Sequence, residues 1–393
     1  MNDKINVAYG SQKRSSILKK RLVFAVFSFS AIFLIMVSSV FAGGKKEKAQ
    51  PEVNANVTIP GSEPQSGEKK PEAVPITVIQ NPKIKSSYVK ESPGGSPVKF
   101  HEVWGYVMQD EEQKFDPATM PLTDLCYFSV DINSYGEASA IPDIKKIKNF
   151  KGRKHLVFTS WGRALTHMVL NPEFGCRNRL LNVIENAAKD YDGIQIDFEN
   201  VPYRDRKHYQ TFLKDIRKRI GQEKWLTVAL AARTKDIVDD IYPYKEIEPL
   251  VDRILVMAYD EHWSTSKPGP VASIEWCSRV ADYCVKTLPN KKLIMGLPFY
   301  GRSWQDTSYS KAWIFKTVNR ILGEKNITNI DRDSANGIPH FEFDATVHVT
   351  GYFDDTYSLV KRARMYQEKG VTRIGFWRIG QEDPDFWPWL GLN

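Results

Sequence analysis

Cysteines are scarce in this 393-residue sequence, which contains four. So few cysteines cannot form the disulfide framework of a small secreted domain. Cys277 and Cys284 lie seven residues apart in a predicted helix, about 10.5 Å along its axis. Because a disulfide joins Cα atoms no more than about 7 Å apart, these two cannot pair, and we interpret all four cysteines as packing residues.

Patterns that bind metals or dinucleotides are also missing. The pair His101-Glu102 lacks the second histidine of a zinc-protease helix. Asp331 and Asp333 lack the glycine and the further ligands of a calcium loop. No G-x-G-x-x-G turn is present, which removes support for a doubly wound dinucleotide-binding sheet. The sequence therefore predicts no metal ion and no other cofactor.

Excess positive charge is nearly absent beyond the first 50 residues. The chain has a net charge of +8, and the first 50 residues account for +7 of it, with nine Lys or Arg against two Asp or Glu. The rest of the chain is therefore close to neutral. A nucleic-acid partner would need a basic surface on the folded part, so we expect none.

A long apolar run follows the basic residues at 19–21. It extends over 22–42 without a charge and ends at Ala42, before two glycines. This pattern predicts a signal peptide within 1–42. The run is also long enough to span a bilayer, so a retained signal anchor is the alternative. In both cases we expect the rest of the chain to be exported to the periplasm, cell envelope or exterior, with membrane contact only through 22–42.

Residues 43–99 have the composition of a disordered linker. They contain eight of the 22 prolines, many Ser, Gly, Glu and Lys residues, and Tyr88 as their single aromatic residue. Such a segment cannot bury enough apolar surface to offset the entropy of ordering the chain. We therefore predict one folded domain at 100–393, tethered by this linker and acting as a monomer.

Short apolar runs alternate with amphipathic stretches from residue 101 onward. Helical spacing of apolar residues is clear at 209–220, which Gly221 ends, and again at 274–284. Alternating strands and helices indicate parallel βα units, and the length fits an α/β fold of the (β/α)8 TIM barrel class. A small α+β insertion is expected at about 305–351, between strand 7 and helix 7. The predicted strands are Val103–Met108, Leu125–Val130, His155–Ser160, Gly193–Glu199, Leu226–Ala231, Arg253–Tyr259, Leu293–Leu297 and Arg373–Trp377.

The fourth predicted strand carries acidic residues on one face. Side chains alternate along a strand, so Gln195, Asp197 and Glu199 share the face opposite the apolar residues between them. Two buried carboxylates are costly unless they are paired or functional, and barrel active sites lie at the C-terminal ends of the strands. Their Cα atoms are about 7 Å apart, close enough for each carboxylate to change the pKa of the other.

The segment Asp192-Gly-Ile-Gln-Ile-Asp-Phe-Glu199 resembles the D-x-x-D-x-D-x-E signature of glycoside hydrolase family 18, the chitinase-like enzymes. The similarity covers essentially all of 101–393, and within the family the sequence is most similar to the bacterial cell-wall and spore-cortex hydrolases. The further matching segments are Val103-Trp-Gly-Tyr106, Val256-Met-Ala-Tyr-Asp260, Gly296-Leu-Pro-Phe-Tyr-Gly-Arg-Ser-Trp304, Gly375-Phe-Trp377 and Trp377-Arg-Ile-Gly-Gln-Glu-Asp-Pro384.

The resemblance implies retaining, substrate-assisted hydrolysis of glycans that contain N-acetylhexosamine. It implies that Glu199 is the general acid and then the base, and that the nucleophile is the substrate's own 2-acetamido carbonyl. Asp197 would orient the acetamido group and stabilise the oxazolinium ion, with Tyr259 as the third catalytic residue. Peptidoglycan, chitin and N-linked glycans all stay open as substrates.

The resemblance also implies a set of substrate-binding residues. Trp377 would form an apolar floor under the distorted sugar, and Asp260 would hold the acetamido group and neighbouring hydroxyls. Arg302 either binds a sugar or pairs with a carboxylate. The complete implied set is Asp260, Trp377, Gln195, Tyr106, Met257 and Arg302.

Two departures from the family pattern leave a second function open. Gln195 stands where the family usually has Asp or Asn, and Thr159-Ser-Trp-Gly162 replaces a Ser-x-Gly-Gly turn. The loss of a charge at Gln195 should weaken the pKa coupling with Asp197. The alternatives to an enzyme are a glycan-binding, lectin-like protein and a scaffold for assembly or adhesion, because a fold does not determine a function.

Overall fold

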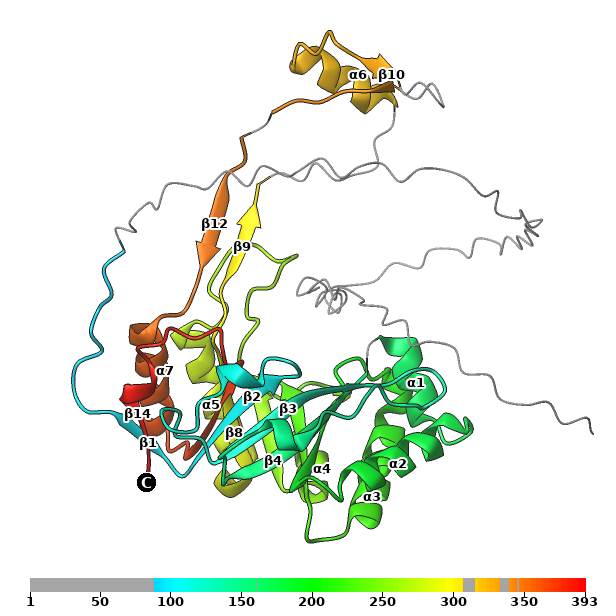
Figure 1. The fold of residues 1–393 in the computed structure, drawn as a ribbon, viewed down its shortest axis with the longest axis vertical. Helices are drawn as coiled ribbons and strands as arrows, with labels where there is room; N and C mark the ends of the chain where they lie inside the picture. The colour runs from blue at the N-terminus through cyan, green and yellow to red at the C-terminus, as the bar shows by residue number, and fades with distance from the viewer. Residues whose placement is uncertain (1–87, 161, 307–314, 333–338, 345) are drawn as a thin grey trace, which may run out of the picture. The chain divides into compact units, whose positions relative to one another are not determined.

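The computed structural model describes residues 88–160, 162–306, 315–332, 339–344 and 346–393. Within them, eight parallel strands close into a barrel in the order β13-β2-β3-β4-β5-β6-β7-β8 (Figure 1). All eight predicted strands are confirmed, with ends that coincide or shift by one or two residues. The barrel strands are β2 (Glu102–Met108), β3 (Asp124–Asp131), β4 (Arg153–Thr159), β5 (Gly193–Asp197), β6 (Trp225–Ala231), β7 (Arg253–Met257), β8 (Leu293–Pro298) and β13 (Arg373–Trp377).

Amphipathic helices cover the outside of the barrel. Helix α3 buries the apolar face predicted from its spacing and ends at Gly221, whose φ of +75° an L side chain would adopt only with strain. Helix α5 begins after Ser273, whose hydroxyl accepts from the amide of Trp276. All four cysteines are buried and unbonded, as predicted. The helices of the ring are α1 (Arg163–Leu170), α2 (Cys176–Ala187), α3 (Arg206–Ile220), α4 (Tyr244–Ile247), α5 (Ile274–Thr287) and α7 (Thr356–Glu368).

Side chains fill the inside of the barrel, so it is a packed core and not a pore. Neighbouring strands supply these residues in layers; Val157, Gln195 and Thr227 are register partners on β4, β5 and β6. The apolar members of the interior are Trp104, Tyr106, Cys126, Phe128, Val157, Ala229, Leu255 and Ile294.

An ionic cluster closes the N-terminal end of the barrel. Glu102 accepts hydrogen bonds from Arg253 at 2.5 Å and from the indole of Trp104 at 3.1 Å, and it lies 3.0 Å from Arg373. Each of these charged residues begins its strand, which places the cluster at one end. Its second carboxylate, Asp124 on β3, accepts two bonds from Arg153 on β4 and lies 2.8 Å from His155.

The insertion lies between β8 and α7, as predicted. Strand β9 (Arg302–Gln305) pairs antiparallel with β12 (Val349–Tyr352), and the indole of Trp304 donates to the carbonyl of Trp263 at 3.1 Å. Between these strands are α6 (Phe315–Glu324), β10 (Asp331–Arg332) and β11 (Pro339–His340).

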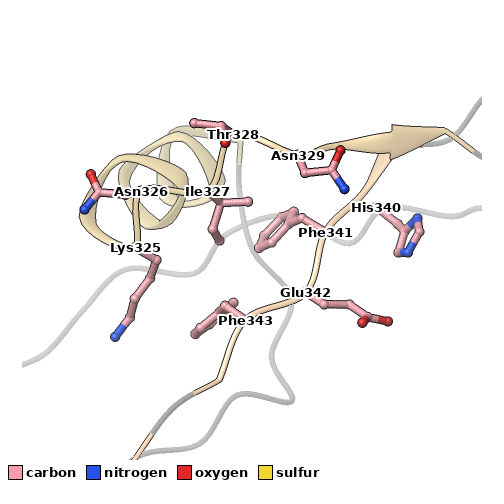
Figure 2. A pocket seen from close by; sticks show the side chains of 9 residues that line it. All are labelled: Lys325, Asn326, Ile327, Thr328, Asn329, His340, Phe341, Glu342 and Phe343. Atoms are coloured by element: carbon pink, nitrogen blue, oxygen red, sulfur yellow. The ribbon is translucent and has the colours of Figure 1, made fainter.

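A hollow of about 440 Å³ lies within the insertion (Figure 2). The chain after α6 and the segment 340–343 form its walls. In Figure 2 the Phe341 side chain points toward Ile327, whereas the Glu342 side chain points away from Ile327. No residue of the predicted active site lines this hollow.

The linker prediction was wrong at its C-terminal end. Residues 88–97, named here the strap, contact the folded domain instead of standing free. Tyr88 packs edge-on against Phe353, and Lys90 pairs with Asp383 at 2.5 Å. Strand β1 (Val98–Phe100) then pairs in parallel with β14 (Leu390–Leu392). Local composition gave no sign of these partners because they lie more than 250 residues away in sequence.

The predicted signal peptide or anchor at 1–42 lies outside the described residues, as does the linker up to residue 87. Within the part of the chain that the structure describes, no helix is long and apolar enough to cross a membrane.

Candidate active site

The candidate site is built where β5 ends. Ile194, Ile196 and Phe198 are buried against the helix ring, which leaves Gln195 and Asp197 on the inward face. This is the alternation predicted from the sequence. Asp197 is the last residue of β5, so Glu199, predicted as part of the strand, belongs to the turn that follows.

Asp197 is buried without a partner for one of its oxygens. The residue is 8% exposed, and none of the described residues donates a hydrogen bond to its Oδ1. Burial raises the pKa of Asp197 from 3.8 to about 7, because the low-dielectric interior disfavours the charged form. A carboxylate in this state can accept a hydrogen bond from a ligand without giving up one in the protein.

Glu199 lies close enough to Asp197 for their ionisations to be coupled. Burial first, and then the charges of Asp197 and Asp260, raise the pKa of Glu199 well above its ordinary value. Because each negative charge makes the other costlier, the two carboxyls hold protons to higher pH than isolated acids do. The arrangement keeps a protonated carboxyl available near neutral pH, which a general acid requires.

Tyr259 and Asp260 follow the end of β7 and face the two acids. Burial raises the pKa of the Tyr259 hydroxyl, and the charges of Asp197 and Glu199 add to that effect. Its ring approaches β8 closely: a Cβ placed on Gly296 would lie 2.7 Å from the carbonyl oxygen of Val256 and 3.0 Å from the Tyr259 ring. Glycine at that position therefore leaves room for both the carbonyl and the tyrosine ring.

Arg302 takes the second of its two predicted roles, pairing with a carboxylate. Its guanidinium donates to Asp260 Oδ1 at 2.6 and 3.1 Å, and the hydroxyl of Tyr300 donates to the same oxygen at 2.6 Å. These three bonds hold one oxygen of Asp260. Tyr300 belongs to the segment that resembles the family, but the sequence gave no reason to choose it.

Trp377 lies at the end of β13 and forms part of an aromatic wall. Its ring contacts Phe128 edge-on, with centroids 4.5 Å apart, and Tyr106 at 5.3 Å. Met257 packs half-buried against the same interior residues. Phe128 was missed in the sequence, because an apolar residue inside a strand is more often a core residue than part of a site.

Gln195 does not fit its predicted role in binding substrate. It is fully buried, its Oε1 accepts from Tyr106 at 2.6 Å, and its Nε2 donates to Thr227 at 3.2 Å. Its polar atoms are therefore used within the barrel, and it reaches the site only through the Tyr106 phenol. The family motif locates this residue correctly, but a motif does not show which partners an amide will find.

Where β4 departs from the family's Ser-x-Gly-Gly pattern, the hydroxyls of Thr159 and Ser160 bond to different partners. Thr159 donates to Asp131 on β3 at 2.8 Å, and Ser160 bonds to Thr166 on α1 at 2.9 Å. Thr159 is the register neighbour of Asp197, so its hydroxyl is the one beside the site. Trp161 lies outside the described residues. Among the described residues, no cluster of three or more His, Cys, Asp or Glu is placed to hold a metal ion.

Comparison with known families and proteins agrees with this geometry. Residues 102–382 match the family model of the glycosyl hydrolases of family 18. The chain is similar to the putative sporulation-specific glycosylase YdhD of Bacillus subtilis, with 27% identity over 63% of this chain and 61% of that protein. It is also similar to a cortical fragment-lytic enzyme of Bacillus anthracis, with 26% identity over 69% of this chain and 68% of the relative.

Solved structures share the fold. The spore cortex-lytic enzyme SleL of Bacillus cereus aligns with a TM-score of 0.57 and 23% identity, covering 77% of this chain and 76% of that structure. A chitinase from Chromobacterium violaceum aligns with a TM-score of 0.57 and 18% identity, covering 74% and 97%. The chain thus spans about three fifths to two thirds of the length of its similar curated relatives.

Proposed function

The chain belongs to glycosyl hydrolase family 18, and we propose that it cleaves β-1,4 bonds of N-acetylglucosamine polymers with retention of configuration. The observation that carries the proposal is the buried pair at the end of β5. No described residue donates a hydrogen bond to Asp197 Oδ1, and the pKa of the neighbouring Glu199 is raised. A pair of this kind is costly to the fold and suits acid catalysis near neutral pH.

In the first step Glu199 protonates the glycosidic oxygen as the bond to the anomeric carbon breaks. The substrate's 2-acetamido carbonyl oxygen attacks that carbon and forms an oxazolinium ion, so no protein nucleophile is needed. Glu199, now a carboxylate, takes a proton from water as the water opens the ring and restores the sugar with its original configuration.

Asp197 acts on the acetamido nitrogen. Its Oδ1, to which none of the described residues donates, accepts the N–H hydrogen bond, which becomes stronger as positive charge develops on the oxazolinium ion. Tyr259 donates to the attacking carbonyl oxygen and aligns it, because its raised pKa keeps the phenol protonated. Among the binding residues, Trp377 supplies an apolar floor next to Tyr106, and Met257 packs beside them. Asp260 is positioned by Arg302 to hold hydroxyls of the sugar.

Peptidoglycan is the substrate that we favour over chitin. Two of the similar relatives are named as a sporulation-specific glycosylase and a cortical fragment-lytic enzyme. The export signal predicted at 1–42 would deliver the barrel to the cell envelope, where such a polymer lies. Cleaved or retained, the signal leaves the catalytic domain on the outer side of the membrane.

The test is mass spectrometry of the products after incubation of the full chain with purified peptidoglycan. New reducing N-acetylglucosamine ends are expected, and they should disappear with Glu199→Gln, which keeps the size of the acid but cannot give up a proton. Release from chitin oligomers and not from peptidoglycan would move the substrate to chitin. Binding without products from either polymer would replace the enzyme with the lectin-like alternative.

A further inference from the structure

One tyrosine hydroxyl joins the backbone on the two sides of Glu199. The Tyr242 hydroxyl donates to the carbonyl of Phe198 at 2.5 Å and accepts from the amide of Val201 at 3.1 Å. These two backbone groups flank the turn that carries Glu199. Because β5 ends at Asp197, no strand pairing fixes the turn itself.

Tyr242 is held in place from its own loop, which connects β6 to α4. Arg233 and Asp240 form a two-bond ion pair at 2.9 and 3.0 Å that closes this loop. Asp240 Oδ1 also accepts from the Tyr242 amide at 3.0 Å, while Arg233 donates to the carbonyl of Ala232 at 3.0 Å. The position of the Tyr242 backbone is thus tied to the end of β6.

The phenol ring is fixed as well. It packs edge-on against Tyr209 of α3, with ring centroids 5.6 Å apart, and the residue is 7% exposed. Burial also raises the pKa of the Tyr242 hydroxyl, so it stays protonated and keeps donating to Phe198 over the working range of the enzyme. Water has little access to compete for either bond.

We propose that Tyr242 is a positioning residue for the general acid. It never touches the sugar; it closes the turn around Glu199 so that the carboxyl meets the glycosidic oxygen at the required distance and angle. The inference rests on the proposed function, in which Glu199 protonates the leaving group. A misplacement of about 1 Å can reduce a rate by about 100-fold, so a single hydroxyl bond can matter here.

The experiment compares Tyr242→Phe with Tyr244→Phe as a matched control. The Tyr244 hydroxyl also donates to a backbone carbonyl near the end of β6, that of Ala231 at 2.7 Å, but it makes no bond to the Glu199 turn. Each variant is assayed on an N-acetylglucosamine oligomer and on its dinitrophenyl glycoside, whose leaving group departs with little help from an acid.

For Tyr242→Phe we expect kcat on the oligomer to fall about 10-fold to 100-fold with KM within about twofold, and kcat on the dinitrophenyl glycoside to fall much less. Tyr244→Phe should match the wild type on both substrates. Equal losses on the two substrates, or no loss on the oligomer, would overturn the positioning role, since general damage does not depend on the leaving group.

A second variant covers the case in which Tyr242→Phe folds poorly. Asp240→Asn keeps the phenol but weakens the ion pair with Arg233. It should give a smaller loss of kcat with the same dependence on the leaving group. If the wild type cleaves neither of these substrates and also leaves purified peptidoglycan uncut, the proposed function fails. If the wild type is active and Glu199→Gln is not, a normal Tyr242→Phe enzyme overturns only the inference about Tyr242.

Discussion

The two ends of the barrel shift the pKa values of their buried carboxylates in opposite directions. Glu102 at the N-terminal end and Asp197 at the C-terminal end are each 8% exposed. Hydrogen bonds from Arg253 and neighbouring donors lower the pKa of Glu102 to about 2 against the opposing effect of burial, whereas burial raises the pKa of Asp197 to about 7. Burial alone therefore does not set the charge state of a group; the hydrogen-bonding and ionic partners around it decide it.

Each end serves a different purpose. The N-terminal end supplies Arg153, Arg253 and Arg373 against two carboxylates, so its charges are compensated and it stabilises the barrel. At the C-terminal end no cation among the described residues pairs with Asp197, so ionisation of that carboxyl destabilises the folded state. A ligand that donates a hydrogen bond to Asp197 Oδ1 would supply a partner that none of the described residues provides.

The largest effect is expected from Asp197→Asn. In the proposed mechanism we expect kcat to fall about 1000-fold while binding is retained, because an amide carries no negative charge to stabilise the oxazolinium ion. Measurement of kcat and KM on an N-acetylglucosamine oligomer checks this. Loss of binding with unchanged kcat would contradict the role of Asp197.

The same variant tests stability against pH. Since the folded-state pKa of Asp197 lies above its unfolded value, its contribution to stability is fully present below about pH 4 and is lost as pH rises through about 7. Asp197→Asn should therefore raise the melting temperature relative to wild type at pH 8 and leave it nearly unchanged at pH 4. An equal difference at both pH values would show that Asp197 does not titrate in this range.

Glu102→Gln should have the reverse profile. Removing the charge leaves Arg253 and Arg373 without their carboxylate partner, whereas Arg153 keeps Asp124. We expect a loss of about 3 kcal/mol in the free energy of unfolding at pH 7. The stability that Glu102 contributes is present above its unfolded pKa and disappears as pH falls toward 2, so wild type and variant should converge in acid. Denaturant melts at several pH values check this, and kcat of the folded variant should stay at the wild-type value.

A smaller effect is expected from Gln195→Asp. A carboxylate at that position adds a negative charge near Asp197 and Glu199, which makes their ionisation harder. In the pH profile of kcat/KM, the alkaline limb should shift to higher pH by about one unit. The matched control is Thr227→Val, which removes one partner of Gln195 without adding charge and should leave the limb in place. A limb that moves equally in both variants would point to a packing effect.

The smallest effect is expected from trimming the insertion. Joining Gln305 to Val349, which are register partners of β9 and β12, with an Asn-Gly turn removes everything beyond the ribbon. If the insertion helps to grip a polymer, KM for long chains should rise by about threefold, with kcat on a dinitrophenyl glycoside unchanged. If trimming leaves KM unchanged for long chains as well as for short ones, that hypothesis is wrong.

The sequence predicted the barrel and the acids because both leave local signals. Strand alternation marks β5, and the acidic motif marks Asp197 and Glu199. Tyr242 left no signal, because its bonds to Phe198 and Val201 join residues more than 40 positions apart. The same reason hid the partners of the strap. Gln195 was located correctly and misinterpreted, since its role depends on which hydroxyls its buried amide meets.

The ribbon of β9 and β12 has a consequence for how this protein family can change over time. The chain leaves the ribbon at Gln305 and re-enters it at the register partner Val349, so the segment between them is attached through these two strands. Because the entropy of closing a loop grows only slowly with its length, insertions and deletions beyond these strands cost the barrel little. Natural selection can therefore lengthen, replace or discard this segment while the barrel and its two buried acids remain where they are.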